Sequence, residues 1–346
     1  MTSYWRNWKV GIPAAALLML ALLTQRHAGL NPAVFADEWF YSKMARLMDL
    51  KDAIVPSYLY LWIFRASNAC GTGFLDCVRF GNAVFFVSAA PFVFLTARAF
   101  TTARVAGLVA VLSLLAPLHL YTAFFMPEAL YYFLFCVLGW VALTREQWSA
   151  TRKALAGGVL LGVMSLVKVH ALFLLPALCL FLLFDSAGAN GGWLRRGLPA
   201  LLLAAVLMLG VKFGVGYLFG GKAALTLFGN FYGAGASAAS QRPLMEFVTP
   251  ALVNLRGHLM AMAVLLPLPL AMLVHALASG GWRERPYNRL YVYTLLMLGA
   301  ALGMTVLYTA SIARPDNNEA LRLHVRYYSF VFPLLFMVAA VPLRNG

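Results

Sequence analysis

Two adjacent carboxylates, Asp37 and Glu38, are the first residues along this sequence that could carry chemistry. They stand in FADEWFYS, soon after an apolar run, in a chain with only 12 Asp and Glu residues. On a helix, Phe40 and Met44 would form an apolar arc, with Glu38 on the polar side and Asp37 close to the arc. A carboxylate against apolar surface holds a proton more tightly, which suits a general base near neutral pH. The alternative is that both acids only stabilise a helix N-terminus.

Two further polar positions interrupt apolar sequence. Glu128 follows Pro127 in MPEALYY, where an acid after a proline is also ordinary chemistry for a helix start. Lys168 and His170 lie inside the apolar stretch SLVKVHALFLLP. A lysine there either extends its ammonium group to the lipid headgroups or contacts a phosphate.

The stretch NNEALRLHVRYYSFVFP, before the last apolar run, holds the densest group of polar residues. Arg322 and Arg326 are four residues apart, so on a helix they share a face and repel each other near its N-terminus. They require a compensating anion, which is either Glu319 or a bound phosphate held by bidentate donors. His324 and Tyr328 share another face and could hydrogen-bond a sugar or a phosphate.

The composition shows which kind of scaffold must position these residues. The chain of 346 residues is 62% hydrophobic and 11% charged, whereas soluble proteins have roughly 45–50% apolar and about 25% charged residues. We therefore expect one all-α, polytopic membrane domain over residues 1–346. The formal net charge is +15, but the basic residues are scattered between apolar runs and form no patch for nucleic acid. Anionic lipid headgroups are the expected partners of these charges.

The apolar runs predict about ten transmembrane helices, because a span needs about 20 residues. The runs are 10–24, 80–97, 105–118, 120–143, 154–167, 169–184, 197–218, 251–278, 290–312 and 325–343. The first is expected to remain as a helix rather than to be removed as a signal peptide. The segment 25–79 is predicted to be a loop with surface helices, the first of them amphipathic, and the Gly/Ala/Ser-rich segment 219–250 a mobile loop.

Ten spans place both termini on one side of the membrane. The short loops on that side carry many Lys and Arg residues, against only Glu146, Asp185 and Glu284, which indicates the cytoplasmic face. The polar positions described above then gather on the opposite face. Cys70 and Cys77 lie on that opposite side and could pair if it is oxidising. The sequence has no GxSxG, HExxH, Walker or CxxC motif.

Four motifs occur in a fixed order along the chain: ADEWFYS, MPEALYYF, LVKVHALFLLP and HVRYYSFVFP. This ordered set resembles the GT-C superfamily of membrane glycosyltransferases, in particular bacterial relatives of protein mannosyltransferases and of lipid A aminoarabinose transferases. The resemblance covers about residues 10–335. Many relatives carry a C-terminal soluble domain or further spans that this sequence does not show, so the architecture does not identify the acceptor.

The resemblance implies transfer of a hexosyl or pentosyl group, with inversion, from a polyprenyl-phosphate-linked donor to a hydroxyl of a glycan, lipid or protein. It implies a bacterial inner-membrane enzyme whose site faces the periplasm. Asp37 matches the general base and Glu38 its supporting acid, and Glu128 joins them as a catalytic candidate. Lys168 and Arg326, with Arg322, are expected to hold the donor phosphate. The substrate-binding candidates are Tyr41, His170, His324 and Tyr328.

Asp37 and Glu38 are also candidate ligands for a divalent cation, Mg²⁺ or Mn²⁺, and the sequence indicates no other cofactor. Two other functions remain open. A transporter or flippase of lipid-linked sugars is expected to show internal repeats and polar groups near the bilayer midplane, and no repeat is apparent. A glycan polymerase or ligase also uses a lipid-linked donor; the late arginines and histidine fit it, but the early acidic pair fits it less well.

Overall fold

The computed structural model of the chain is a helical bundle whose described regular structure contains no strand. It describes residues 2–31, 36–187, 193–233, 243–280, 283, 287–314 and 317–345. The all-α fold class is therefore confirmed for this part of the chain. In a bilayer each backbone N–H and C=O must be satisfied within the protein, and an α-helix does this inside one segment.

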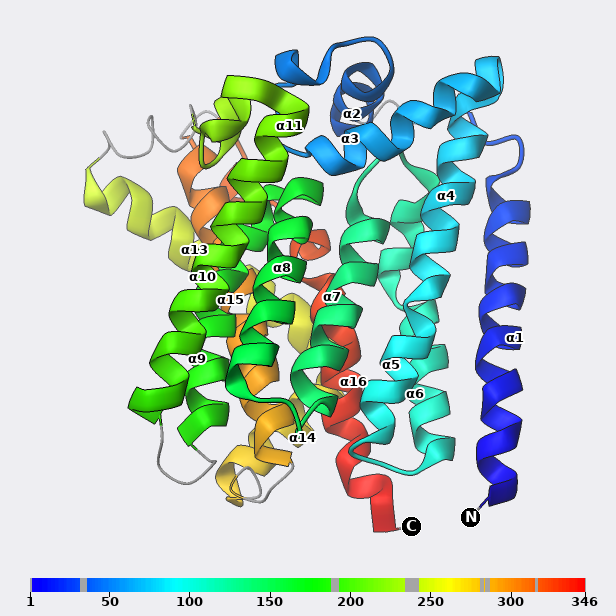
Figure 1. The fold of residues 1–346 in the computed structure, drawn as a ribbon, viewed down its shortest axis with the longest axis vertical. Coiled ribbons are helices and arrows are strands. Elements are labelled where there is room, and N and C mark those ends of the chain that lie inside the picture. The colour runs from blue at the N-terminus through cyan, green and yellow to red at the C-terminus, as the bar shows by residue number, and fades with distance from the viewer. Residues whose placement is uncertain are drawn as a thin grey trace.

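Most helices of the bundle run roughly along the vertical axis of Figure 1, whereas α13 runs obliquely. These helices are α1 (Thr2–His27), α4 (Phe74–Ser88), α5 (Ala90–Arg98), α6 (Ala103–Leu115), α7 (Glu128–Thr144), α8 (Ala150–Val167), α9 (Leu174–Ala187), α10 (Leu198–Gly210), α13 (Leu244–Leu265), α14 (Pro267–Ala278), α15 (Tyr287–Ile312) and α16 (Phe332–Ala340). Three further helices are α2 (Ala36–Arg46), α3 (Tyr58–Arg65) and α11 (Gly216–Gly220). Segments Trp193–Gly197 and Val211–Val215, which flank α10, are π-helical.

Seven described helices are long and apolar enough to cross a membrane, or eight if the bent pair Ala103–Leu115 and Pro117–Ala123 forms one span. This is fewer than the ten expected. Three of the expected segments give apolar helices of only 10–17 residues: Glu128–Thr144, Pro267–Ala278 and Ser329–Leu343. Prolines explain two of these breaks, because Pro127 and Pro267 lack the N–H that a continuing helix requires.

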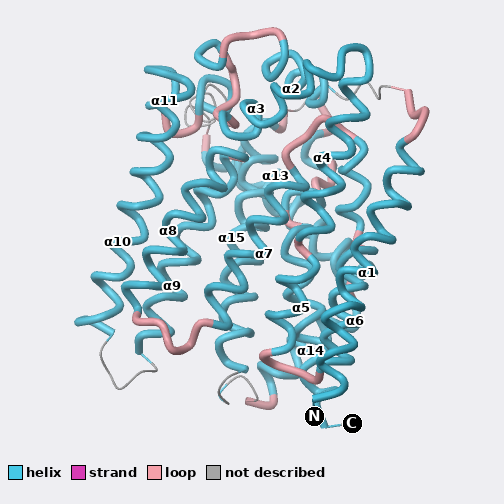
Figure 2. The backbone as a smooth tube through the Cα atoms, turned by 45° about the vertical axis from the view of Figure 1, so that its right-hand side comes forward, coloured by secondary structure: helices cyan, strands magenta, loops and turns pink. Residues whose placement is uncertain are grey.

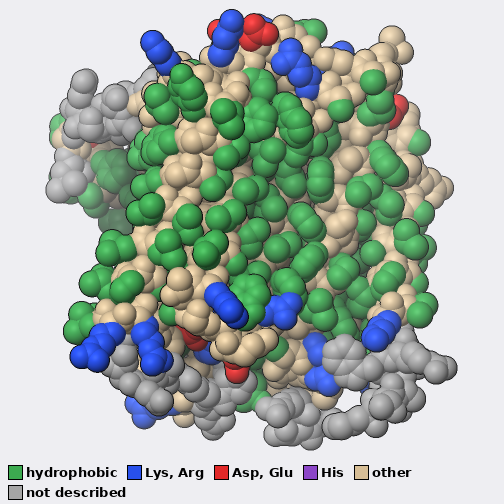
Figure 3. Space-filling model, in the orientation of Figure 1, with side chains coloured by type: hydrophobic (Ala, Val, Ile, Leu, Met, Phe, Trp, Pro, Cys, Tyr) green, Lys and Arg blue, Asp and Glu red, His purple; other side chains and the backbone are tan. Residues whose placement is uncertain are grey.

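The bundle has two ends of different character. Both termini lie at the lower end of Figure 1, and α2, α3 and α11 lie at the upper end. We call these the termini end and the α2 end. Figure 2 shows both termini at the lower end after a turn of the molecule. Between the ends, the surface in Figure 3 is largely hydrophobic, as a lipid-facing surface must be, with Lys and Arg side chains near the upper and lower rims.

Helices α2 and α3 lie within the segment 25–79. Helix α2 begins with Asp37 and Glu38 in its first turn and has Lys43 and Arg46 in its last, an order that complements the helix dipole. Cys70, in the 3₁₀ segment before α4, and Cys77, in the first turn of α4, form a disulfide. The described residues of this segment therefore form part of the α2 end.

The described part of segment 219–250 is mostly helical, with a 3₁₀ segment at Gly221–Leu225 and the start of α13 at Leu244. The central residues of the expected mobile loop, 234–242, lie outside the described residues. That expectation is therefore not tested over its central part.

Close packing of α8 against α10 and the following segment Val211–Val215 depends on two glycines. A Cβ atom on Gly158 would lie 2.6 Å from the carbonyl oxygen of Ala204, and one on Gly162 would lie 2.6 Å from Cβ of Val211. Such distances are too short for any side chain, so only glycine permits this approach. The packing fixes α8, whose C-terminal cap is Lys168.

Candidate active site

Four segments far apart in sequence bring ionisable side chains together at the α2 end. They are α2, the start of α7, the residue after α8 and the 3₁₀ turn Val325–Tyr327. Arg326 Nη2 donates to Asp37 Oδ2 at 2.5 Å, and Lys168 Nζ donates to Glu128 Oε1 at 2.8 Å. The sequence predicted all four residues as site residues, and the structure places them in two adjoining ion pairs.

The Glu128–Lys168 pair is almost completely buried, with 4% and 7% of the two side chains exposed. Glu128 is the first residue of α7, and Lys168 ends α8 in extended conformation, so its side chain leaves the helix and reaches the neighbouring helix start. A buried charge without a partner is very costly, which makes each residue dependent on the other. One ammonium N–H is directed to Glu128, and two remain for a ligand.

The Asp37–Arg326 pair is more open, since 43% of the Asp37 side chain is exposed. Burial alone would lower the pKa of Arg326, but the nearby groups of Glu128, Tyr327 and Asp37 outweigh it and raise that pKa above its ordinary value. Arg326 is thus held as a cation. Its pair with Asp37 is more exposed than the Glu128–Lys168 pair, although both pairs line one cavity.

Tyr327 lies at the centre of the cluster. Its ring stacks on His324 at 5.2 Å between centroids and contacts His170 at 4.7 Å. Lys168 Nζ and the Arg326 guanidinium carbon lie 4.7 and 4.9 Å from the ring centroid, and Arg326 Nη2 donates to Tyr327 Oη at 3.1 Å. The aromatic face therefore holds two like charges close together through cation–π contacts.

A cavity of about 70 Å³ opens onto these residues. Its lining includes both cations, both paired carboxylates and several aromatic side chains: Asp37, Phe40, Tyr41, Met44, Ile54, Val55, Met126, Glu128, Lys168, Phe231, Tyr232, Tyr308, Arg326 and Tyr327. The cavity is smaller than the roughly 300–1,000 Å³ of a typical ligand pocket. It can thus take an anionic group of a ligand, whereas the rest of that ligand must extend outside it.

Glu38 does not line this cavity. It is 4% exposed, and its Oε1 accepts the backbone N–H of Phe125 at 3.0 Å, which ties α2 to the turn before α7. Burial raises the pKa of Glu38 above its ordinary value, although the Phe125 hydrogen bond acts in the opposite direction. The two acids therefore have different surroundings: Asp37 faces the cavity and Glu38 holds α2 in place.

Among described residues, no group of three or more His, Cys, Asp and Glu side chains could hold a metal ion. Asp37 and Glu38 engage different partners, the guanidinium of Arg326 and the N–H of Phe125. As placed here, the acidic pair does not form a shared metal site.

The segment around Arg322 differs from the expected helix. A 3₁₀ turn at Glu319–Leu321 precedes Arg322, which has extended backbone, and a second turn follows at Val325–Tyr327. Arg322 and Arg326 therefore do not share a helix face, and that prediction was wrong. Arg322 is exposed and pairs with Glu319 at 3.2 Å, away from the cavity lining.

The predicted substrate-binding residues lie at different positions relative to the cavity. Tyr41 lines the cavity, and His170 lines a smaller neighbouring one with Lys168 and Tyr327. His324 is buried behind Tyr327, where burial and the nearby arginines lower its pKa. Tyr328 lies outside the cavity lining and bonds His258 of α13 instead, at 3.0 Å from Tyr328 Oη to Nδ1.

Sequence reasoning missed several residues that the structure brings to the site. Tyr327 was passed over for its neighbour Tyr328, although the doublet in HVRYYS was the available signal. Tyr232 and Tyr308 line the cavity from the segment before α13 and from α15, where no local pattern marks them. Asn254 of α13 donates from Nδ2 to the carbonyls of Ala320 and Arg322, at 3.1 and 3.0 Å, and so holds the loop before Arg326.

Comparison with known families identifies one family model that matches part of the chain. Residues 56–215 match the model of the dolichyl-phosphate-mannose-protein mannosyltransferase family, which is a GT-C family. The chain matches none of the curated proteins with which it was compared. The matched segment includes Glu128, Lys168 and His170 and ends before Arg326. The match confirms the resemblance to the GT-C superfamily and supports a membrane glycosyltransferase of that type.

Proposed function

We propose that this protein transfers a sugar from a polyprenyl-phosphate donor to an acceptor hydroxyl, with Asp37 as the general base. The observation that carries the proposal is the meeting of two carboxylate–cation pairs, Asp37–Arg326 and Glu128–Lys168, at one cavity of the α2 end. Such a transfer needs a base for the acceptor and cations for the departing phosphate. Both kinds of group line this cavity.

Two independent features support an extracytoplasmic position for the site. The Cys70–Cys77 disulfide lies in the segment that forms the α2 end, and disulfides persist in oxidising compartments. The short loops of the opposite, termini end carry Lys and Arg with few acids, as expected for a cytoplasmic face. In a bacterial inner membrane, the α2 end would face the periplasm.

In the proposed mechanism, the donor phosphate lies against Arg326 and Lys168. Arg326 turns part of its guanidinium from Asp37 to the phosphate, which leaves a carboxylate oxygen of Asp37 for the acceptor. The acceptor O–H gives its proton to Asp37 as its oxygen forms a bond to the sugar's anomeric carbon. The bond from that carbon to the phosphate oxygen breaks on the opposite face, and its electron pair leaves with the phosphate, so the configuration inverts.

The buried pair sets the position of the second cation in this reaction. The hydrogen bond to Glu128 holds the Lys168 side chain in place, so little reorganisation is needed as negative charge develops on the leaving phosphate. The phenol oxygen of Tyr327 accepts a hydrogen bond from Nη2 of Arg326, the same nitrogen that donates to Asp37. Aromatic side chains make up much of the remaining wall and limit the access of water.

Asp37→Asn tests the proposal, with Asp49→Asn as the matched control. Asp49 is an exposed acid of the same segment whose partner is Lys51, at 3.4 Å. Both variants would be reconstituted in liposomes with polyprenyl-phosphate-linked sugars and membrane acceptors, and labelled product would be measured. A positioned base contributes about 10²–10⁴-fold to the rate. The activity of Asp37→Asn should therefore fall by about that factor, and the activity of Asp49→Asn should stay close to that of the wild type. Full activity of Asp37→Asn would refute the assignment of the base.

A further inference from the structure

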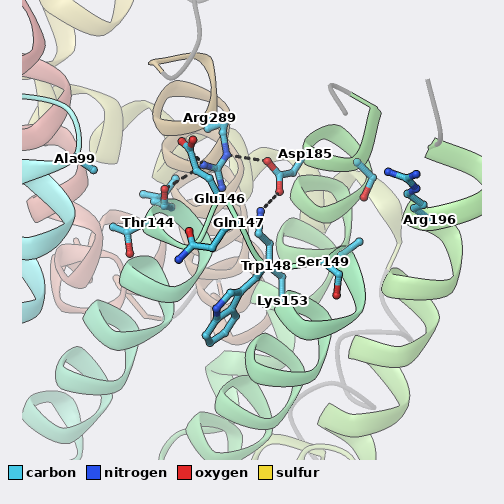
Figure 4. Close-up of a pocket in the computed structure, with 13 residues that line it drawn as sticks. Ala99, Thr144, Glu146, Gln147, Trp148, Ser149, Lys153, Asp185, Arg196 and Arg289 are labelled. Atoms are coloured by element: carbon cyan, nitrogen blue, oxygen red, sulfur yellow. Dashed lines mark hydrogen bonds and ion pairs between the residues drawn. The ribbon is translucent and has the colours of Figure 1, made fainter. Parts of the chain in front are cut away.

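A second and larger cavity, of about 700 Å³, lies at the termini end of the bundle (Figure 4). It is formed where α7 and α9 end and where α8 and α15 begin. Its lining is Ala99, Leu143, Thr144, Glu146, Gln147, Trp148, Ser149, Ala150, Lys153, Asp185, Ser186, Arg196 and Arg289. None of these residues takes part in the site at the α2 end, and the volume falls within the range of ligand pockets.

A row of alternating charges forms one wall of this cavity. Arg289 Nη1 donates to Glu146 at 2.7 Å, its Nε lies 2.7 Å from Asp185 in a charge contact, and Lys153 donates to Asp185 at 2.6 Å. Arg289 also donates to the carbonyls of Leu143 and Ala142 at the end of α7. The four charges therefore neutralise one another and join four helix ends.

The groups left for a ligand are mainly hydrogen-bond donors. Arg196 is exposed, and the structure shows no hydrogen bond or ion pair for it among the residues described. The amide of Gln147 and the hydroxyl of Ser186 likewise have no hydrogen-bond partner within the described ranges. Ser149 uses its oxygen to accept the backbone N–H of Arg152, which leaves its O–H free to donate. One unpaired guanidinium with neutral donors around it recognises an anionic group rich in oxygen, such as a phosphate.

The surroundings of Arg196 favour a lipid as the source of that phosphate. Trp193 and Leu194, in the same π-helical segment, are 50% and 59% exposed. Exposed Trp and Leu beside Arg are typical of the boundary between headgroups and acyl chains. The volume also exceeds what a bare phosphate needs and leaves room for a glycerol headgroup.

We propose that this cavity binds a phosphate-bearing anionic ligand, most readily the headgroup of an anionic phospholipid, and that Arg196 is the cation that recognises it. The site lies at the opposite end of the bundle from Asp37 and does not depend on the sugar-transfer proposal. Because α7, α8 and α15 run from this cavity to the cluster at the α2 end, a ligand here would contact helices that position Glu128 and Lys168.

The test compares Arg196→Ala with Arg195→Ala. Arg195 is the adjacent exposed cation, but it does not line the cavity. Each full-length variant would be placed in nanodiscs of phosphatidylcholine with a minor share of phosphatidylglycerol, and retained lipid would be measured by native mass spectrometry. Inorganic phosphate alone would be titrated as a second probe by calorimetry. Thermal unfolding of both variants would verify that they fold.

Wild-type protein and Arg195→Ala should retain phosphatidylglycerol, and Arg196→Ala should bind it at least about tenfold less tightly, since one charge-assisted contact is lost. Binding of inorganic phosphate without retention of phosphatidylglycerol, again lost in Arg196→Ala, would support the anion site and identify free phosphate as its ligand. Equal binding by the two variants, or no binding of either probe to wild type, would overturn the proposal.

Discussion

Lys168→Met is the substitution whose consequences follow most directly from the structure. It keeps the length of the side chain and removes the cation, which leaves the carboxylate of Glu128 buried, 4% exposed, without its ionic partner. Breaking a buried pair in this way costs about 3–5 kcal/mol. At 1.4 kcal/mol per factor of ten, the ratio of folded to unfolded protein should fall by roughly two to three and a half powers of ten.

The double variant Glu128→Gln/Lys168→Met provides the control for that effect. Replacing both partners by neutral groups of similar shape is close to neutral for stability, because no buried charge remains. Thermal unfolding in detergent, followed by size-exclusion fluorescence, should therefore show a large loss for Lys168→Met and recovery in the double variant. The coupling between the two positions can be obtained from the double-mutant cycle.

Activity separates the two roles of this pair. The double variant should fold and yet transfer no sugar, because the ammonium proposed to hold the donor phosphate is absent. A single variant as stable as wild type would show that Lys168 does not neutralise Glu128 in the folded protein. An active double variant would remove Lys168 from the proposed phosphate site.

Two further predictions concern residues that hold the site in place. Asn254→Asp keeps the side-chain shape but loses both N–H donors to the loop. Amide hydrogen exchange in residues 319–326 should therefore rise, and the KM for the donor should increase. Arg256→Ala, on the exposed face of α13, should change neither quantity. Unchanged exchange would show that Asn254 does not restrain the loop. Burial raises the pKa of Glu38 above 4.5, so the folded protein holds that proton more tightly than the unfolded chain does. Stability should therefore fall as pH rises from 4.5 through the raised pKa. Thermal midpoints measured across that pH range should show this fall in the wild type and not in Glu38→Gln. The same pH profile in both proteins would show that Glu38 does not have a raised pKa in the folded state.

Local pattern was sufficient for the fold class and for most of the ionisable residues at the α2 end. Apolar runs require helices because a bilayer offers no hydrogen-bond partners to the backbone, and this requirement is readable in the sequence. Charged residues inside or beside such runs are costly unless they have a partner, so Asp37, Glu128, Lys168 and Arg326 stood out by type and position.

Only the tertiary structure decided which charged residues pair and which side chains face the cavity. Asp37 and Arg326 are 289 residues apart, and no periodicity indicates that they meet. The choice of Tyr327 over Tyr328 depended on 3₁₀ turns in place of an α-helix, which changes the direction of every side chain in that segment. Glu38 and Asp37 are neighbours in sequence, yet a helix separates adjacent side chains by 100°, so one faces the cavity and the other the Phe125 amide. The cavity beside Arg196 had no sequence signal either, because its walls are four helix ends that only packing brings together.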